Sequence, residues 1–146
     1  MKVVVQRSLK SSVSVNNKIV GEIDYGLVLL VGFTYGDDIN TINKMIQKII
    51  NLRIFNDENN VMNKSLLDIN GSVLSISQFT LYADTKKGNR PSYRKSLDRE
   101  EAIKLYNLFN DNLKSNNVHV ETGIFGSDMK VNINNDGPVT IILESE

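Results

Sequence analysis

Four polar side chains able to take part in chemistry stand close together in the apolar stretch Val73–Ala83, namely Ser75, Ser77, Gln78 and Thr80. The stretch is rich in strand formers and follows Gly71, which predicts a buried strand running into a surface loop. Strict alternation would put polar residues on both faces. Buried hydroxyls and amides need hydrogen-bond partners, so this cluster is costly as packing and plausible as a site. The alternative, that these side chains bond only neighbouring backbone, is favoured by the stretch taken alone.

Side-chain nucleophiles and bases are scarce. The absence of cysteine excludes disulfides, a thiolate nucleophile and zinc-thiolate sites. Thr80 is a possible nucleophile, but its hydroxyl needs a base within reach, and no closely spaced carboxylate pair accompanies the strand. The single histidine, His119, alternates with Val118 and Val120, which predicts inward valines and a solvent-facing imidazole. A catalytic His119 is the minor alternative.

Composition bounds the class of protein. A chain of 146 residues is long enough for a genuine core, and no linker or low-complexity tract divides it, so we expect a single domain over residues 1–146. No secretory signal pattern is present, and no apolar run approaches the length of a membrane span. We therefore expect a soluble, cytoplasmic protein. Nothing in the sequence suggests a metal or a cofactor.

Basic residues gather downstream of the polar cluster although the formal net charge is zero. Between residues 86 and 99 only Asp98 opposes the basic residues Lys86, Lys87, Arg90, Arg94, Lys95 and Arg99. Such a cluster is most simply a solvated surface. Its position beside a small polar pocket also suits the phosphates of a nucleic-acid end.

Apolar spacing predicts the elements that must position these residues. Asn16-Asn17 predicts a hairpin turn, because asparagine tolerates positive φ. Gly26–Phe33 is apolar on both faces, as expected of a central strand covered on two sides. Asp37 or Asp38 can begin a helix whose apolar residues are Ile39, Ile42, Met45, Ile46, Ile49 and Ile50.

A second helix is predicted after Asp98, with the apolar stripe Ala102, Leu105, Tyr106, Phe109 and Leu113. Further strands are predicted at residues 1–7, 53–55, 118–122, 129–134 and 139–143. Strands, then strand-and-helix units, then strands again indicate a single mixed α/β domain with two packed or curled β-sheets covered by two helices.

Gly137-Pro138 opens the last predicted strand. Proline can begin a strand because its missing N–H costs nothing there. The dipeptide alone does not predict a cis bond, since only about 5–6% of X-Pro bonds in folded proteins are cis. A cis bond would turn two backbone carbonyls outward in a fixed geometry.

Three segments together resemble the D-aminoacyl-tRNA deacylase family: Ser77–Ala83, Lys87–Ser92 and Asn135–Thr140. The resemblance covers essentially the entire chain, including residues 4–7, 51–55 and 122–129. Separated motifs in the right order make it specific. Two departures stand outside the proposed site: Ser8 replaces an aliphatic residue and Tyr93 replaces phenylalanine.

The resemblance implies the family's fold and a homodimeric enzyme that hydrolyses the ester between a D-amino acid and the 3′-terminal adenosine of tRNA, as chiral proofreading in translation. It also implies that Gly137-Pro138 is cis and that each subunit's dipeptide enters the other's pocket. There Gly137 and Pro138 would hold the substrate's α-amino group and reject an L side chain.

Roles for the remaining site residues follow from the same resemblance. Ser77, Gln78, Phe79 and Thr80 would form the pocket wall, with the Phe79 N–H near the scissile carbonyl. Phe125 and Met129 would line the adenine site, and Arg7 would steady the Gly-Pro loop. The residues expected to contact tRNA phosphates are Lys86, Lys87 and Arg90.

This chemistry suits a chain without an activated nucleophile. An aminoacyl ester is already reactive and carries a neighbouring ribose 2′-hydroxyl, so positioning and a backbone oxyanion donor can suffice. If selection excludes L side chains, glycyl-tRNA should also be a substrate. Two alternatives stay open: Thr80 as a covalent nucleophile, and a dimeric RNA-end binding module that cleaves nothing.

Overall fold

Five strands form the sheet on which the rest of the chain is built. In the computed structural model, which describes residues 1–145, their order is β10 (Asn135–Glu144), β1 (Lys2–Ser8), β4 (Gly26–Gly32), β7 (Ser72–Ser77) and β8 (His119–Thr122). β1 is antiparallel to both of its neighbours, whereas β4, β7 and β8 run parallel. The carboxyl ends of β4 and β7 therefore lie at the same end of the sheet.

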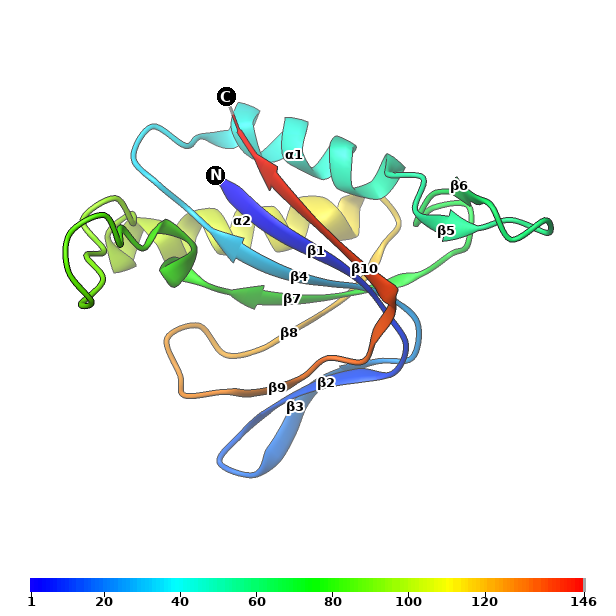
Figure 1. Ribbon diagram of the computed structural model, residues 1–146, viewed down its shortest axis with the longest axis horizontal. Helices are drawn as coiled ribbons and strands as arrows, with labels where there is room; N and C mark the ends of the chain where they lie inside the picture. Colours follow the sequence, from blue (N-terminus) through cyan, green and yellow to red (C-terminus); the bar gives the residue numbers. More distant parts are fainter. Residues whose placement is uncertain (146) are drawn as a thin grey trace.

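Two helices, α1 (Ile39–Asn51) and α2 (Arg99–Ser115), cover one face of this sheet (Figure 1). Asp38 caps α1 by accepting a hydrogen bond from the Thr41 N–H at 2.9 Å, a contact that stabilises a helix by about 1 kcal/mol. The predicted helical spacing is confirmed, because the buried apolar residues are Ile42, Met45, Ile46, Ile49 and Ile50 in α1 and Tyr106, Phe109 and Leu113 in α2. Among residues 1–145, neither helix has the length and apolarity needed to cross a membrane.

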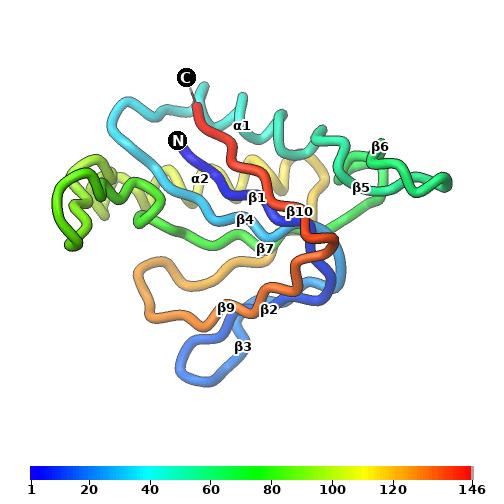
Figure 2. The backbone as a smooth tube through the Cα atoms, viewed as in Figure 1, coloured from blue at the N-terminus to red at the C-terminus, as the bar shows by residue number. Residues whose placement is uncertain are grey.

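A three-stranded sheet of β3 (Lys18–Ile23), β2 (Ser11–Val15) and β9 (Lys130–Asn132) packs on the opposite face, as the backbone trace in Figure 2 shows. The predicted hairpin joins β2 to β3, and both asparagines of its turn have positive φ. A short hairpin of β5 (Phe55–Asn56) and β6 (Met62–Lys64) follows α1.

β4 is covered on both faces, as its sequence predicts. Leu27 and Leu29 belong to the core beneath the helices, whereas Val28 belongs to the core between the two sheets. A strand of this kind needs apolar side chains at successive positions because both faces are buried. The predicted mixed α/β arrangement of two packed sheets and two helices is confirmed.

The predicted strand Val73–Ala83 is wrong beyond Ser77. β7 ends there, and a 3-10 helix follows at Phe79–Tyr82. β8 pairs with β7 only as far as Ser75, so the later backbone groups find partners locally instead. The Leu81 N–H donates to the Gln78 carbonyl, and the Ala83 N–H to the Thr80 carbonyl. The polar cluster therefore stands on a strand end and a tight turn.

Candidate active site

A cavity of about 310 Å³, here called the strand-end cavity, opens at the carboxyl ends of β4 and β7. Ligands of parallel sheets commonly bind at this end of the strands. The lining comes from β4, β7 and the residues that follow each strand, from α2 and the residue Leu97 before it, and from β9 and the segment that precedes it. The lining residues are Val31, Gly32, Phe33, Ile76, Ser77, Gln78, Phe79, Leu97, Ala102, Phe125, Gly126, Ser127, Met129 and Val131. No side chain in this set carries a charge.

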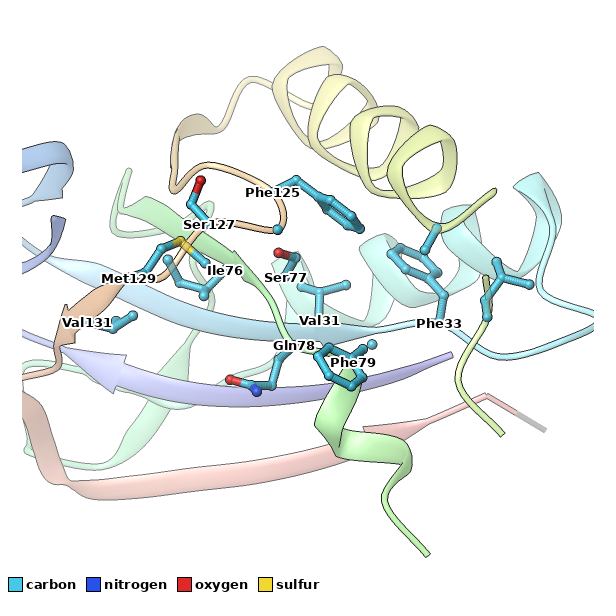
Figure 3. Close-up of a pocket in the computed structure, with 14 residues that line it drawn as sticks. Val31, Phe33, Ile76, Ser77, Gln78, Phe79, Phe125, Ser127, Met129 and Val131 are labelled. Carbon is cyan, nitrogen blue, oxygen red and sulfur yellow. The ribbon is translucent and has the colours of Figure 1, made fainter. Parts of the chain in front are cut away.

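Five of the predicted site residues line the strand-end cavity: Ser77, Gln78, Phe79, Phe125 and Met129. Figure 3 shows Ser77, Phe125 and Met129 around one hollow, although they come from β7 and from the segment after β8. The sulfur of Met129 occupies the space that a Cβ on Gly123 would need, so glycine at position 123 lets Met129 form the wall. The Ser77 hydroxyl has no hydrogen-bond partner within residues 1–145 and is available to a ligand.

Thr80 does not line the cavity, although it was predicted to form its wall. Its hydroxyl accepts a hydrogen bond from the Gln78 side-chain amide. Within the described chain no carboxylate or imidazole is hydrogen-bonded to this hydroxyl, so the geometry offers no base to activate it. Thr80 instead holds the Gln78 amide in place.

The backbone of Phe79 is fixed on both sides, yet its own N–H is free. The Gln78 N–H donates to the Val31 carbonyl at 2.7 Å, and the Phe79 carbonyl accepts from the Ser96 hydroxyl at 2.9 Å. Among residues 1–145 no acceptor lies within hydrogen-bond reach of the Phe79 N–H. A fixed, unpartnered N–H at a cavity wall is the type of group that stabilises an oxyanion.

Gly137-Pro138 lies elsewhere, in a bulge of β10 opposite Arg7. The predicted cis bond is confirmed. The buried Arg7 guanidinium donates through Nε to the Asp136 carbonyl, lies 3.1 Å from the Asp136 carboxylate, and donates through Nη1 to the Ile54 carbonyl at 2.8 Å. Gly137 has φ of +120°, where L side chains are rarely found. Arg7 therefore contacts the dipeptide loop from inside the protein.

The dipeptide and the strand-end cavity lie at opposite ends of the five-stranded sheet. Arg7, beside the dipeptide, pairs with Leu27 at the start of β4, whereas Ser77 pairs with Val31 near the end of β4. These positions are about 13 Å apart along the strands, and β10 and β7 are separated by about 14 Å across the sheet. The dipeptide therefore lies well away from the cavity of its own chain.

The basic loop follows the 3-10 helix and starts from the cavity end of the sheet. The side chains of Lys86, Lys87 and Arg90 are exposed, and within residues 1–145 none of them forms an ion pair. The loop is closed by paired backbone hydrogen bonds between Asp84 and Ser92. The Lys86 N–H and the nearby Lys95 ammonium hold the pKa of Asp84 below its usual range, so this carboxylate stays charged at the base of the loop.

His119 lies away from the cavity, as its alternation predicts. It pairs with Ser72 at the start of β7, and its exposed ring contacts the Glu121 carboxylate at 3.2 Å. The sequence did not predict that Leu97 and Ala102 line the cavity. Both lie at or near the start of α2, and no local pattern there indicates a cavity, because its other walls come from distant parts of the chain. In the part of the chain that the structure describes, no three His, Cys, Asp or Glu residues cluster as metal ligands.

Comparisons with known proteins agree over the whole chain. Residues 4–144 match the family model of D-Tyr-tRNA(Tyr) deacylase. A "D-aminoacyl-tRNA deacylase" of Clostridium beijerinckii is 54% identical over 146 residues, covering 100% of this chain and 98% of the relative. Among solved structures, a "c-Myc DNA Unwinding Element Binding Protein" has a TM-score of 0.94 at 39% identity and covers 100% of this chain and 99% of its own. A probable eukaryotic D-amino acid tRNA deacylase shares the fold, with a TM-score of 0.84 at 17% identity and 97% of each chain covered.

Proposed function

Since the chain belongs to the D-Tyr-tRNA(Tyr) deacylase family, we propose that it hydrolyses the ester bond of D-aminoacyl-tRNA and releases free D-amino acid and tRNA. This activity serves chiral proofreading in translation. The observation that carries the mechanism is the free, fixed Phe79 N–H at a cavity whose lining side chains include no charged group.

Main-chain chemistry accounts for hydrolysis in such a cavity. Water attacks the ester carbonyl carbon, and the Phe79 N–H stabilises the oxyanion that forms. The bond to the ribose 3′-oxygen then breaks. The neighbouring 2′-hydroxyl relays a proton: it gives its own to the leaving 3′-oxygen and takes one from the attacking water, so both ribose hydroxyls are intact in the released tRNA. Ser77 and Gln78 hold the reacting group in position, which lowers the entropic part of the barrier. No covalent intermediate with the protein forms.

A second copy of the chain completes the site. Gly137-Pro138 is exposed and lies about 13 Å along and 14 Å across the sheet from its own cavity, so it reaches a cavity only in a partner subunit. In the homodimer its carbonyls accept hydrogen bonds from the substrate's α-amino group, and its backbone leaves no room for an L side chain. Arg7 keeps this loop in position.

The terminal adenosine occupies the apolar part of the strand-end cavity. Phe125 packs against the Tyr106 ring at 5.7 Å, which fixes one aromatic wall. Met129 supplies a polarisable side chain on the other side, suited to a purine face. Outside the cavity, Lys86, Lys87 and Arg90 contact tRNA phosphates.

Incubation with D-Tyr-tRNA and L-Tyr-tRNA tests the proposed function. We expect rapid loss of the D ester and persistence of the L ester. If both esters persist while tRNA binds, the protein is a dimeric RNA-end binding module instead. The exposed basic loop and the nucleic-acid-binding name of one structural neighbour favour that second candidate.

Thr80→Ala tests the rival mechanism with a covalent nucleophile. Most of the activity should remain, because the Thr80 hydroxyl lies outside the cavity and has no base, and the variant loses only the hydrogen bond that Thr80 accepts from the Gln78 amide. A complete loss of activity in a folded variant, together with a trapped acyl-protein in the unsubstituted chain, would establish the rival instead.

A further inference from the structure

A second cavity, of about 440 Å³ and here called the aromatic cavity, adjoins the strand-end cavity. The two share the wall residues Phe79, Leu97, Ala102, Phe125 and Gly126. The aromatic cavity is completed by Tyr93, Ser96, Asp98 and Arg99. A ligand that fills the first cavity can therefore continue into the second along a common border.

Arg99 places a positive charge at this border. Its guanidinium lies over Gly126, where an added Cβ would come within 2.7 Å of Nη2. Gly126 has a φ of +76°, so glycine allows both this backbone conformation and the close approach of the guanidinium. Arg99 forms no ion pair within residues 1–145. A planar guanidinium of this kind is well suited to a phosphate diester.

Two exposed aromatic rings stand on the same cavity. The rings of Phe79 and Tyr93 meet edge to face at 5.1 Å, and the two residues are 57% and 39% exposed. Exposed rings beside a cationic side chain commonly stack on nucleic-acid bases. The Asp98 carboxylate, the one acidic group of this cavity wall, accepts a hydrogen bond from the Tyr35 hydroxyl at 3.3 Å.

We propose that the aromatic cavity binds the nucleotide that precedes the terminal adenosine of tRNA. Tyr93 stacks on its base, and Arg99 pairs with the phosphate that joins it to the adenosine. This inference rests on the proposed function, which puts the terminal adenosine in the strand-end cavity. The shared wall leads the chain of nucleotides from one cavity into the other, and the Arg99 guanidinium stands where the connecting phosphate must pass.

Two minimal substrates isolate this subsite: a D-aminoacyl ester of adenosine and the same ester of the dinucleotide CpA. The measured quantity is the ratio of their kcat/KM values, dinucleotide over adenosine. We expect the unsubstituted protein to prefer the dinucleotide. Tyr93→Leu and Arg99→Gln should each lower the ratio about fivefold or more, the lower end of what one stacked base contributes. Tyr93→Phe should retain the ratio, because it keeps the ring.

Lys104→Gln is the matched control, because it removes one positive charge from an exposed, ion-paired side chain of the same helix. It should leave the ratio unchanged. Competition by free CpA and free adenosine, neither carrying an amino acid, gives a readout independent of turnover. We expect CpA to compete better than adenosine, and Arg99→Gln should abolish that advantage.

An unsubstituted protein with a ratio near one, or ratios unaltered by both Tyr93→Leu and Arg99→Gln, would overturn the subsite and leave the deacylase function intact. Failure of the unsubstituted protein to cleave D-aminoacyl-tRNA itself would overturn the proposed function and the subsite with it.

Discussion

The two ends of the five-stranded sheet differ in whether their polar groups have hydrogen-bond partners within the protein. At the cavity end, the Phe79 N–H and the Ser77 hydroxyl have no partners within residues 1–145, although the backbone around them is fixed. At the dipeptide end, the protein satisfies its own polar groups. The Arg7 guanidinium contacts four oxygens, which belong to Ile54, Asn56 and Asp136, and the Asn135 amide bridges the carbonyls of Arg7 and Val139 at 2.9 Å each. The cavity end leaves polar groups free for a ligand, whereas the dipeptide end uses its polar groups to hold an exposed loop in place.

The largest effect is expected where the cavity end loses its free donor. Phe79→Pro removes the N–H while suiting the first position of the 3-10 helix, where proline is tolerated. We expect kcat for D-Tyr-tRNA to fall by about 10² to 10³, the usual cost of losing one oxyanion donor.

Phe79→Leu is the control, because it loses the ring and keeps the N–H. Single-turnover rates should separate the two variants. If Phe79→Pro and Phe79→Leu had equal rates and both kept intact circular dichroism spectra, the Phe79 N–H would not stabilise the oxyanion.

A further test combines one variant from each end of the sheet in a single dimer. Gly137→Ala puts a Cβ 3.0 Å from both the Arg7 Nη2 and a Val139 methyl at a φ that disfavours side chains, so we expect activity to fall tenfold or more, in line with the roughly 1–3 kcal/mol of such backbone strain. Phe79→Pro and Gly137→Ala homodimers should then each keep about a tenth of the unsubstituted activity or less.

A heterodimer of these variants, purified through two different tags, should regain about half of the unsubstituted activity, because one of its two sites combines an intact cavity with an intact dipeptide. A heterodimer as inactive as its parents would mean that each dipeptide serves its own chain.

Glycine distinguishes exclusion from recognition at the dipeptide end. If the projection only rejects an L side chain, Gly-tRNA presents nothing to reject and should be cleaved at a rate closer to that of D-Ala-tRNA than to that of L-Ala-tRNA. Deacylation rates for the three esters under identical conditions decide this. A glycyl ester as persistent as the L-alanyl ester would indicate that the site grips the D side chain.

The smallest expected effect concerns the basic loop at the cavity end. Joint replacement of Lys86, Lys87 and Arg90 by glutamine should weaken binding of every tRNA alike. It should also reduce the slope of log K against log salt by roughly 0.7–0.9 for each phosphate that the protein no longer neutralises. The same three-charge change at Lys18, Lys44 and Lys48, which are also exposed, is the control. If the substitutions weakened binding only for tRNA that carries one particular amino acid, the loop would contact the aminoacyl ester instead of the phosphates.

The sequence predicted the fold well for elements whose apolar residues follow directly from which of their faces are buried. α1 begins at the predicted cap Asp38, and β4 is apolar on both sides because two layers cover it. The end of β7 could not be predicted in the same way. Its length depends on how far β8 runs beside it, and that partner is more than 40 residues later in the chain.

Only part of the candidate site was predicted, because some of its contacts also depend on segments far apart in the chain. The residues Ser77, Phe79, Phe125 and Met129 line one cavity, as the resemblance implied. Thr80 was expected there too, but β7 ends at Ser77 and the 3-10 helix that follows leaves Thr80 outside the cavity. Arg99 and Gly126 form a contact that only the packing of α2 against a distant loop creates. No local pattern reports such a contact.

The uncharged lining of the strand-end cavity has a consequence for kinetics. None of its side chains gains or loses a proton between about pH 4 and 10, so the cavity wall itself contributes no inflection to a pH–rate profile. A bell shape, if one is measured, belongs to the amino group of the substrate or to a group delivered from outside the wall. The pH dependence of turnover therefore reports the ionisation of the bound substrate and of groups that reach the cavity from outside its wall.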